Sequence, residues 1–244
     1  MEKPSSRDIP NPVKRAVRQR CGFGCVICGS PIYHYDHMKE WAIYQRHVAE
    51  EITLLCPTHH QEKTSGLLSS DTVESYNANP YNKKILYSPK WKIHYGKEIK
   101  TIIGTVSMTF PEVEDYNNVE FFSVPLMVGG QPVIWFNLED GNLLLNIVIL
   151  GKSQPILVIS NNELVYSIAS WDIEFVGRTL TIREGLRKVI FNITFDVSRN
   201  QVIIDKGFFV WRERTISITK EYFEINSVRF YGGGVEGGKY GIIC

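Results

Sequence analysis

Hydrophobic positions change their spacing about a third of the way along the chain. Before residue 77 they occur in short clusters between polar residues and glycines, which predicts short helices and strands. Asn11-Pro12 opens a predicted helix from Val13 to Arg20, and Gly22 and Gly24 end it. The other elements predicted here are a strand at 32–37, a turn with irregular helix at 39–50, an apolar run at 52–55, and helices at 57–64 and 71–76, the last capped by Asp71.

From Lys92 onward the apolar residues form short runs rich in Val, Ile, Phe and Thr, often alternating with polar residues. Thirteen strands are predicted, at 101–110, 119–128, 132–137, 143–150, 155–160, 164–168, 173–176, 179–183, 188–195, 201–204, 208–212, 216–220 and 222–231. Asp140-Gly141, Asn161-Asn162, Glu184-Gly185, Arg199-Asn200 and Lys206-Gly207 are predicted turns. This spacing favours a β-sandwich or barrel; a stacked solenoid is the alternative, but the segment has no strict repeat.

The two patterns predict an α+β chain of two domains. Residues 77–89 are rich in Asn, Pro and Tyr, which is typical of a linker. We therefore expect a small domain at 1–76, a linker at 77–91, and a larger, mainly antiparallel all-β domain at 92–244. The glycine-rich segment 232–241 is predicted to be a loop.

Composition narrows the class of protein. The 43% hydrophobic content is too high for a disordered chain. No run of about 18 apolar residues indicates a membrane-spanning helix, and the first residues lack the apolar core of a signal peptide. These features predict a cytoplasmic protein that does not associate with membranes. Five cysteines are too few for a disulfide scaffold, so in a reducing compartment they indicate metal binding.

Two pairs of metal-binding residues lie at matched intervals. Cys25 and Cys28 form one pair, and Cys56 and His59 form the other. Four thiolate or imidazole ligands can enclose one tetrahedral zinc ion with no open position, so the site is expected to be structural. A segment of about 65 residues buries little apolar surface and would gain stability from such a metal. The alternative is two unrelated pairs of buried Cys and His.

Residues 20–66 resemble the zinc-knuckle branch of the HNH (ββα-metal) endonucleases. The resemblance lies in the Cys25/Cys28 pair, Asp36-His37 at the end of a predicted strand, the Cys56/His59 pair, and the His60 and Lys63 that follow. It covers about a fifth of the chain and is specific because six or seven residues match together. The resemblance implies a small zinc-stapled ββα-metal domain and cleavage of nucleic acid.

The resemblance also implies roles for single residues. Asp36 and His60 would bind a catalytic Mg²⁺ or Mn²⁺ ion. His37 points away from Asp36 if both lie on a strand, and would act as general base. Lys63, one helical turn after His60, would contact a phosphate oxygen. His59 and His60 could exchange their zinc and catalytic roles.

One position departs from the family pattern. The family has Asn fourteen residues after the base, where this chain has Glu51; with the register shifted by one, Glu50 would take its place. Glu51 is expected to accept a hydrogen bond from His37 and hold its tautomer, or to raise the pKa of His37 and slow catalysis at neutral pH. His47 could support the centre or be exposed, whereas His34 and His94 are expected to be structural.

Charge is distributed unevenly. The net charge of +1 divides into +4 for residues 1–95 and −3 for the remainder. A basic excess beside a cleavage centre suits a polyanionic substrate. The predicted DNA contacts are Lys14, Arg15, Arg18, Arg20 and Lys63. A solvated helix face is the alternative for the four residues of the first helix.

These observations predict a metal-dependent endonuclease acting on double-stranded DNA. By analogy with the family it would serve in restriction or phage defence. The β domain has no recognised catalytic motif. Target recognition is one use of such a domain, but it is expected rather to regulate the nuclease or to assemble it into a homodimer or higher oligomer. The alternative is a zinc-dependent DNA-binding or interaction protein whose nuclease centre is weakened or inactive.

Overall fold

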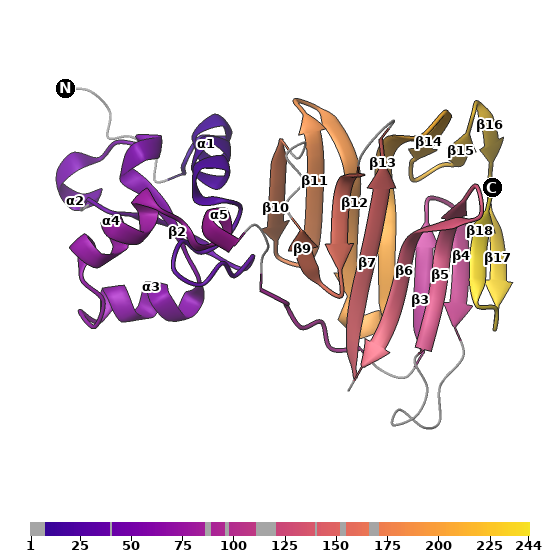
Figure 1. Ribbon diagram of the computed structural model, residues 1–244, viewed down its shortest axis with the longest axis horizontal. Helices are drawn as coiled ribbons and strands as arrows, with labels where there is room; N and C mark the ends of the chain where they lie inside the picture. Colours follow the sequence, from indigo (N-terminus) through magenta and orange to yellow (C-terminus); the bar gives the residue numbers. More distant parts are fainter. Residues whose placement is uncertain are drawn as a thin grey trace. The chain divides into compact units, whose positions relative to one another are not determined.

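The computed structural model describes residues 8–39, 41–85, 89–95, 98–110, 121–139, 141–151, 155–165 and 171–244. Its contacts divide the chain into two compact units, residues 1–89 with 172–174 and residues 90–171 with 175–244. The first unit holds the α-helices of Figure 1, and the second is built of strands apart from the 3₁₀ helix η2 (Val197–Arg199). The chain is therefore α+β, as the hydrophobic pattern predicts.

The first unit begins with helix α1 (Asn11–Cys21), which has Pro12 in its first turn and ends at Gly22 in the left-handed conformation, φ +69°. It continues through β1 (His34–His37), α2 (Trp41–Tyr44), the 3₁₀ helix η1 (Ala49–Glu51), β2 (Ile52–Leu55), α3 (Pro57–Thr64), α4 (Ser70–Ala78) and α5 (Tyr81–Ile85). Ser69, rather than the predicted Asp71, caps α4 by accepting a hydrogen bond from the Thr72 amide.

Strands β1 and β2 form an antiparallel pair in which His34 lies opposite Leu55 and His37 opposite Ile52. All four residues of β2 are buried, and they pack with Val17 and Cys21 of α1 in the core of this unit. Helix α3 begins two residues after β2. The order strand, strand, helix therefore places the end of β1 beside the start of α3.

The second unit contains two sheets. One has the strand order β18-β5-β6-β7-β8-β9, and the other has β10-β11-β12-β13-β14-β15-β16, with β3 paired to both β13 and β4, and β17 paired to β4. Their bounds are β3 Ile99–Ile103, β4 Val106–Phe110, β5 Phe121–Val128, β6 Gln131–Glu139, β7 Asn142–Leu150, β8 Pro155–Ser160, β9 Glu163–Val165, β10 Asp172–Val176, β11 Thr179–Gly185, β12 Lys188–Asp196, β13 Gln201–Trp211, β14 Arg214–Ile218, β15 Phe223–Ile225, β16 Val228–Phe230, β17 Gly233–Glu236 and β18 Tyr240–Ile243.

Most neighbouring strands of the second unit are antiparallel, but β3 pairs with β13, β17 with β4 and β18 with β5 in parallel. Both sheets end in edge strands. Among the described strands this favours the sandwich over the closed barrel, and β7 of one sheet approaches β13 of the other (Figure 1). The core is made of alternating Ile, Val, Leu and Phe side chains from both sheets.

Several sequence predictions need correction. The predicted strands at 101–110 and 222–231 are each two paired strands, β3 with β4 and β15 with β16. Lys206-Gly207 is not a turn, because β13 runs through it as one strand and Gly207 faces the Ile190 carbonyl too closely for a side chain. The glycine-rich segment 232–241 contributes to β17 and β18 rather than forming only a loop. The predicted linker 77–89 contains the end of α4 and all of α5, so this segment belongs to the first unit.

Two predicted strands extend beyond the structure's described ranges, since residues 119–120 and 166–168 lie outside them. Within the described ranges, no helix combines the length and apolar character needed to cross a membrane.

Candidate functional site

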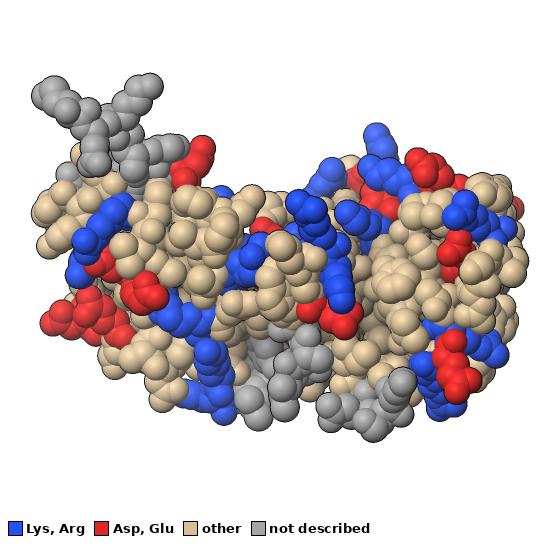
Figure 2. Space-filling model, turned by 90° about the horizontal axis from the view of Figure 1, so that it is seen from above, with Lys and Arg blue, Asp and Glu red and all other residues tan. Residues whose placement is uncertain are grey.

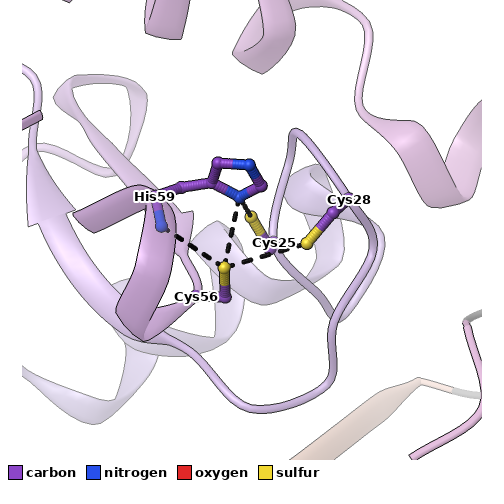
Figure 3. Close-up of side chains that lie close together, drawn as sticks. All are labelled: Cys25, Cys28, Cys56 and His59. Atoms are coloured by element: carbon purple, nitrogen blue, oxygen red, sulfur yellow. Dashed lines mark hydrogen bonds between the residues drawn. The ribbon is translucent and has the colours of Figure 1, made fainter. Parts of the chain in front are cut away.

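Four side chains of the first unit converge on one point. The ligand atoms of Cys25, Cys28, Cys56 and His59 all lie within 4.8 Å of one another (Figure 3). The Cys28 and Cys56 sulfurs are 3.8 Å apart, and His59 Nδ1 is 3.4 Å from the Cys25 sulfur and 3.2 Å from the Cys56 sulfur. A tetrahedral zinc ion would hold two sulfurs about 3.8 Å apart and a sulfur and a nitrogen about 3.5 Å apart. The four residues can therefore bind a metal ion such as zinc.

The two pairs come from different local structures. Cys25 and Cys28 lie in the turn that precedes β1, and the Cys25 carbonyl accepts a hydrogen bond from the Gly29 amide at 2.7 Å. Cys56 is the N-cap of α3, and its sulfur accepts from the His59 amide at 3.5 Å. The His59 ring, in the first turn of the helix, lies against the sulfurs of Cys25 and Cys56, which assigns His59 rather than His60 to this cluster.

The environment favours the thiolate form of Cys25. The hydrogen bond from the Cys28 thiol and those from the backbone amides of Cys28, Cys56 and Ile27 lower the pKa of the Cys25 thiol well below its ordinary value, against the effect of burial. Thiolates are the form in which cysteine binds metals.

Asn82 supports the turn that carries Cys25 and Cys28. Its buried side-chain amide donates to the Gly22 carbonyl at 2.9 Å and to the Gly29 carbonyl at 3.1 Å. Gly29 has φ +75°, and a side chain there would clash with Asn82. Sequence reasoning missed Asn82 because it lies in the predicted linker, where no local signal indicates a contact with residues more than fifty positions earlier.

A second polar group lies at the end of β1. The Asp36 carboxylate is nearly buried, and its Oδ1 atom is 3.7 Å from Nε2 of His60 on α3. The Lys63 ammonium donates to Asp36 Oδ2 and, at 2.9 Å, to the His37 carbonyl. The structure therefore brings the predicted metal pair together. It also places Lys63 against Asp36 rather than in the expected phosphate contact.

His37 is held by a residue that the sequence left open. Its Nε2 atom lies 3.2 Å from Nδ1 of His47, and the two ring centroids are 5.4 Å apart. Burial, followed by the positive charge of His47, lowers the pKa of His37. His47 thus supports His37. The exposed His34 ring lies 5.4 Å from the ring of His60, and the exposed His94 belongs to the second unit.

Glu51 does not take the position expected from the family pattern. Its carboxylate accepts hydrogen bonds from Lys39 Nζ at 3.0 Å, from Arg46 Nε at 3.0 Å and from Arg46 Nη2. Hydrogen bonds from Arg46 and then Lys39 lower the pKa of Glu51 to about 2. The predicted rise in the pKa of His37 is also wrong, because burial outweighs the small effect of Glu51.

The basic residues of α1 differ in their availability. Arg18 is buried, and its guanidinium binds the Asp172 carboxylate through two hydrogen bonds of 2.7 Å; Asp172 is one of the three later residues of the first unit. Arg20 donates to the carbonyls of Ala49 and Ile52. Arg18 is therefore structural, whereas Arg20 is partly exposed. Lys14 and Arg15 are partly exposed.

Comparisons with known proteins found no relative from which a function could be assigned. The chain matches no family model, and no curated protein and no solved structure matches it.

Proposed function

We propose that this chain is a metal-dependent endonuclease of the HNH type that hydrolyses phosphodiester bonds of double-stranded DNA. The observation that carries the proposal is the approach of Asp36 Oδ1 to His60 Nε2, at 3.7 Å, beside a histidine held by a second histidine. Asp36 and His37 lie on β1, and His60 lies on α3, which follows β2 in the chain. This order and these residue types support the resemblance described above.

The donor pair fits a hard divalent cation. Ligands at about 2.1 Å from an octahedral ion lie about 3.0 Å apart when adjacent and about 4.2 Å apart when opposite. The 3.7 Å between the Asp36 oxygen and the His60 nitrogen is longer than the separation of adjacent ligands, so the two side chains would move closer together to share one ion. A carboxylate oxygen suits Mg²⁺, and the imidazole nitrogen extends the choice to Mn²⁺. When bound, such a cation would stabilise negative charge on the scissile phosphate and the leaving oxygen.

His37 supplies the base in this proposal, and His47 sets its tautomer. One proton lies between His37 Nε2 and His47 Nδ1, because these atoms are at hydrogen-bonding distance. If His37 donates this proton, its Nδ1 atom carries the lone pair that can accept a proton from water. The lowered pKa of His37 keeps the ring neutral at physiological pH, as a general base requires.

The Cys25/Cys28/Cys56/His59 cluster would hold this centre in shape. Cys56 and His59 flank the start of α3, directly before the proposed ligand His60. A zinc ion there would fix α3 against the turn before β1, and so fix His60 relative to Asp36. We further propose that the second unit regulates or assembles the nuclease, as a homodimer or higher oligomer, and that the protein serves in restriction or phage defence by analogy with the family.

One observation favours the alternative of a zinc-dependent DNA-binding protein with an inactive centre. The Lys63 ammonium binds Asp36, so a positive charge already neutralises the carboxylate that the catalytic cation would need. A chain that binds duplex DNA and contains zinc, but does not cut, would fit this alternative.

A plasmid-cleavage assay with Mg²⁺ or Mn²⁺ tests the proposal. Wild type is compared with His37→Ala and with His94→Ala, which removes an exposed histidine of the second unit. We expect cleavage by wild type and by His94→Ala, and a loss of about 100-fold or more in His37→Ala. Equal cutting by all three proteins, or no cutting by any of them with either metal, would refute the proposal that this chain is an endonuclease.

A further inference from the structure

Two basic side chains beside the proposed centre share one internal carboxylate. The Arg46 guanidinium contacts both oxygens of Glu51 in a bidentate pair, and the Lys39 ammonium contacts one of the same oxygens at 3.0 Å. The side chains of Lys39 and Arg46 are 48% and 52% exposed, whereas that of Glu51 is 15% exposed. The two cations therefore face solvent, with the carboxylate beneath them.

An exposed aromatic ring completes this group. Lys39 Nζ lies 5.7 Å from the centroid of Tyr44, and the Arg46 guanidinium carbon lies 5.5 Å from it. Tyr44 is 49% exposed. The group is also close in sequence to the proposed base and its partner, because Lys39 follows His37 by two residues and Arg46 immediately precedes His47.

The geometry of this group suits a phosphate. A bidentate guanidinium with a neighbouring ammonium is a common way for proteins to hold phosphate oxygens, and a carboxylate presents a similar pair of charged acceptors. On the face shown in Figure 2, basic and acidic side chains are interspersed over the surface. Lys39 and Arg46 differ from such scattered charges because one carboxylate brings them together.

We propose that Lys39 and Arg46 form a seat for a backbone phosphate of duplex DNA and that Glu51 is an internal competitor for that seat. The placement of the seat beside the cleavage centre rests on the function proposed above. On binding, a DNA phosphate would replace the Glu51 carboxylate at Lys39 and Arg46. The free energy lost when these two cations separate from Glu51 would reduce the affinity gained from their contacts with the phosphate. Glu51 thereby weakens DNA binding and limits retention of the substrate.

The backbone of Glu51 is held independently of its side chain. Its carbonyl accepts from the Met38 amide at 2.9 Å, and its amide donates to the Val48 carbonyl at 3.0 Å. Glu51→Gln preserves these bonds and the side-chain shape while it removes the negative charge. Glu50→Gln removes the same charge from the same 3₁₀ helix and serves as the matched control.

The test is fluorescence anisotropy with a labelled DNA duplex of about 25 base pairs, over a series of salt concentrations and without added Mg²⁺ or Mn²⁺. At low salt we expect Glu51→Gln to bind roughly threefold to tenfold more tightly than wild type, with a salt slope steeper by about one. Glu50→Gln should stay within about twofold of wild type. Arg46→Met, an exposed position, should bind more weakly and with a shallower slope.

The double variant Arg46→Met/Glu51→Gln tests whether the tighter DNA binding of Glu51→Gln comes from the seat. Its affinity should match that of Arg46→Met within about twofold, because without Arg46 the Glu51 carboxylate competes only for the single contact with Lys39. Unchanged or weaker binding by Glu51→Gln would overturn the proposal. So would equal tightening by Glu50→Gln, or a full effect of Glu51→Gln in the Arg46→Met background.

Zinc content and circular dichroism confirm that each variant is folded. Because binding is measured without catalytic metal, the result does not depend on cleavage. Tighter DNA binding by Glu51→Gln in a protein that never cuts DNA would support the phosphate seat and refute the proposed nuclease activity. Cleavage by the wild type, with no change in DNA affinity in Glu51→Gln, would support the nuclease activity and refute the seat.

Discussion

His37 Nε2 lies 3.2 Å from His47 Nδ1, so the proposed base is paired with a second imidazole rather than with the carboxylate of Glu51. An imidazole acceptor fixes the tautomer of His37 without the negative charge by which a paired carboxylate would raise the pKa of His37. The proposed base therefore stays neutral near physiological pH.

Replacement of His47 tests this pairing. His47→Ala removes the acceptor and should lower kcat for cleavage by about 10- to 100-fold, whereas His47→Gln retains an acceptor oxygen and should recover part of the activity. DNA affinity, measured by anisotropy without catalytic metal, should be unchanged in both. Equal losses in the two variants, or a loss that follows DNA affinity, would contradict a positioning role.

Lys63 competes with a cation for the charge of Asp36. Lys63→Met removes this competition, so we expect the variant to bind Mn²⁺ about tenfold more tightly than wild type in titration calorimetry without DNA. Lys63→Arg keeps the charge and should stay near wild type. If Lys63→Met instead leaves Mn²⁺ binding unchanged and weakens DNA binding, the original expectation of a phosphate contact is correct.

The four-residue cluster predicts about one zinc per chain. Cys28→Ala removes one of its ligands and should lose both the zinc and the stability of the first unit, since a small unit gains much of its folding free energy from such a metal. Elemental analysis and thermal unfolding measure the two effects. Cys244→Ser, which changes a thiol of the second unit, is the control; equal zinc loss in both variants would exclude the cluster as the site.

Asn82 should matter although it lies outside every recognised motif. Asn82→Ala leaves the buried Gly22 and Gly29 carbonyls without its amide, so we expect the free energy of unfolding of the first unit to fall by about 1–3 kcal/mol. Urea denaturation measures this change. The exposed neighbour Asn79 gives the control, and an equal effect of Asn79→Ala would remove the special role of Asn82.

The pKa of Glu51, about 2, makes its competition for the seat insensitive to pH. The carboxylate stays charged at any pH well above 2. The ratio of DNA affinities between Glu51→Gln and wild type should thus be the same at pH 5.5 and pH 8.0. Anisotropy at the two pH values checks this, and a ratio that approaches one at pH 5.5 would show that Glu51 is protonated there.

Local spacing was enough to predict the metal cluster, because its ligands lie at positions fixed by one turn and one helix start. It could not decide between His59 and His60, since that depends on the rotation of α3 about its cap. Helix α3 directs His59 toward the sulfurs and His60 toward Asp36. The partners of Glu51 could not be predicted from the sequence either, because Arg46 and Lys39 come close to Glu51 only in the folded chain.

The second unit shows where local signals fail. Lys206-Gly207 has the composition of a turn, but the close approach of the Ile190 carbonyl makes glycine the fitting residue inside β13. The glycine-rich residues of β17 and β18 have little strand propensity of their own. They become strands by pairing with β4 and β5, more than a hundred residues earlier.

The pairing of β17 with one sheet and β18 with the other also bears on the order of folding during synthesis. Neither sheet has its full set of strands until residues 233–243 have been made. Helices α1 to α5 and strands β1 and β2 are made roughly 160 residues sooner, which corresponds to about 8–30 s of translation, and only residues 172–174 of the first unit come later. The nascent chain could thus bind zinc before the last strands of the β sandwich have been synthesised.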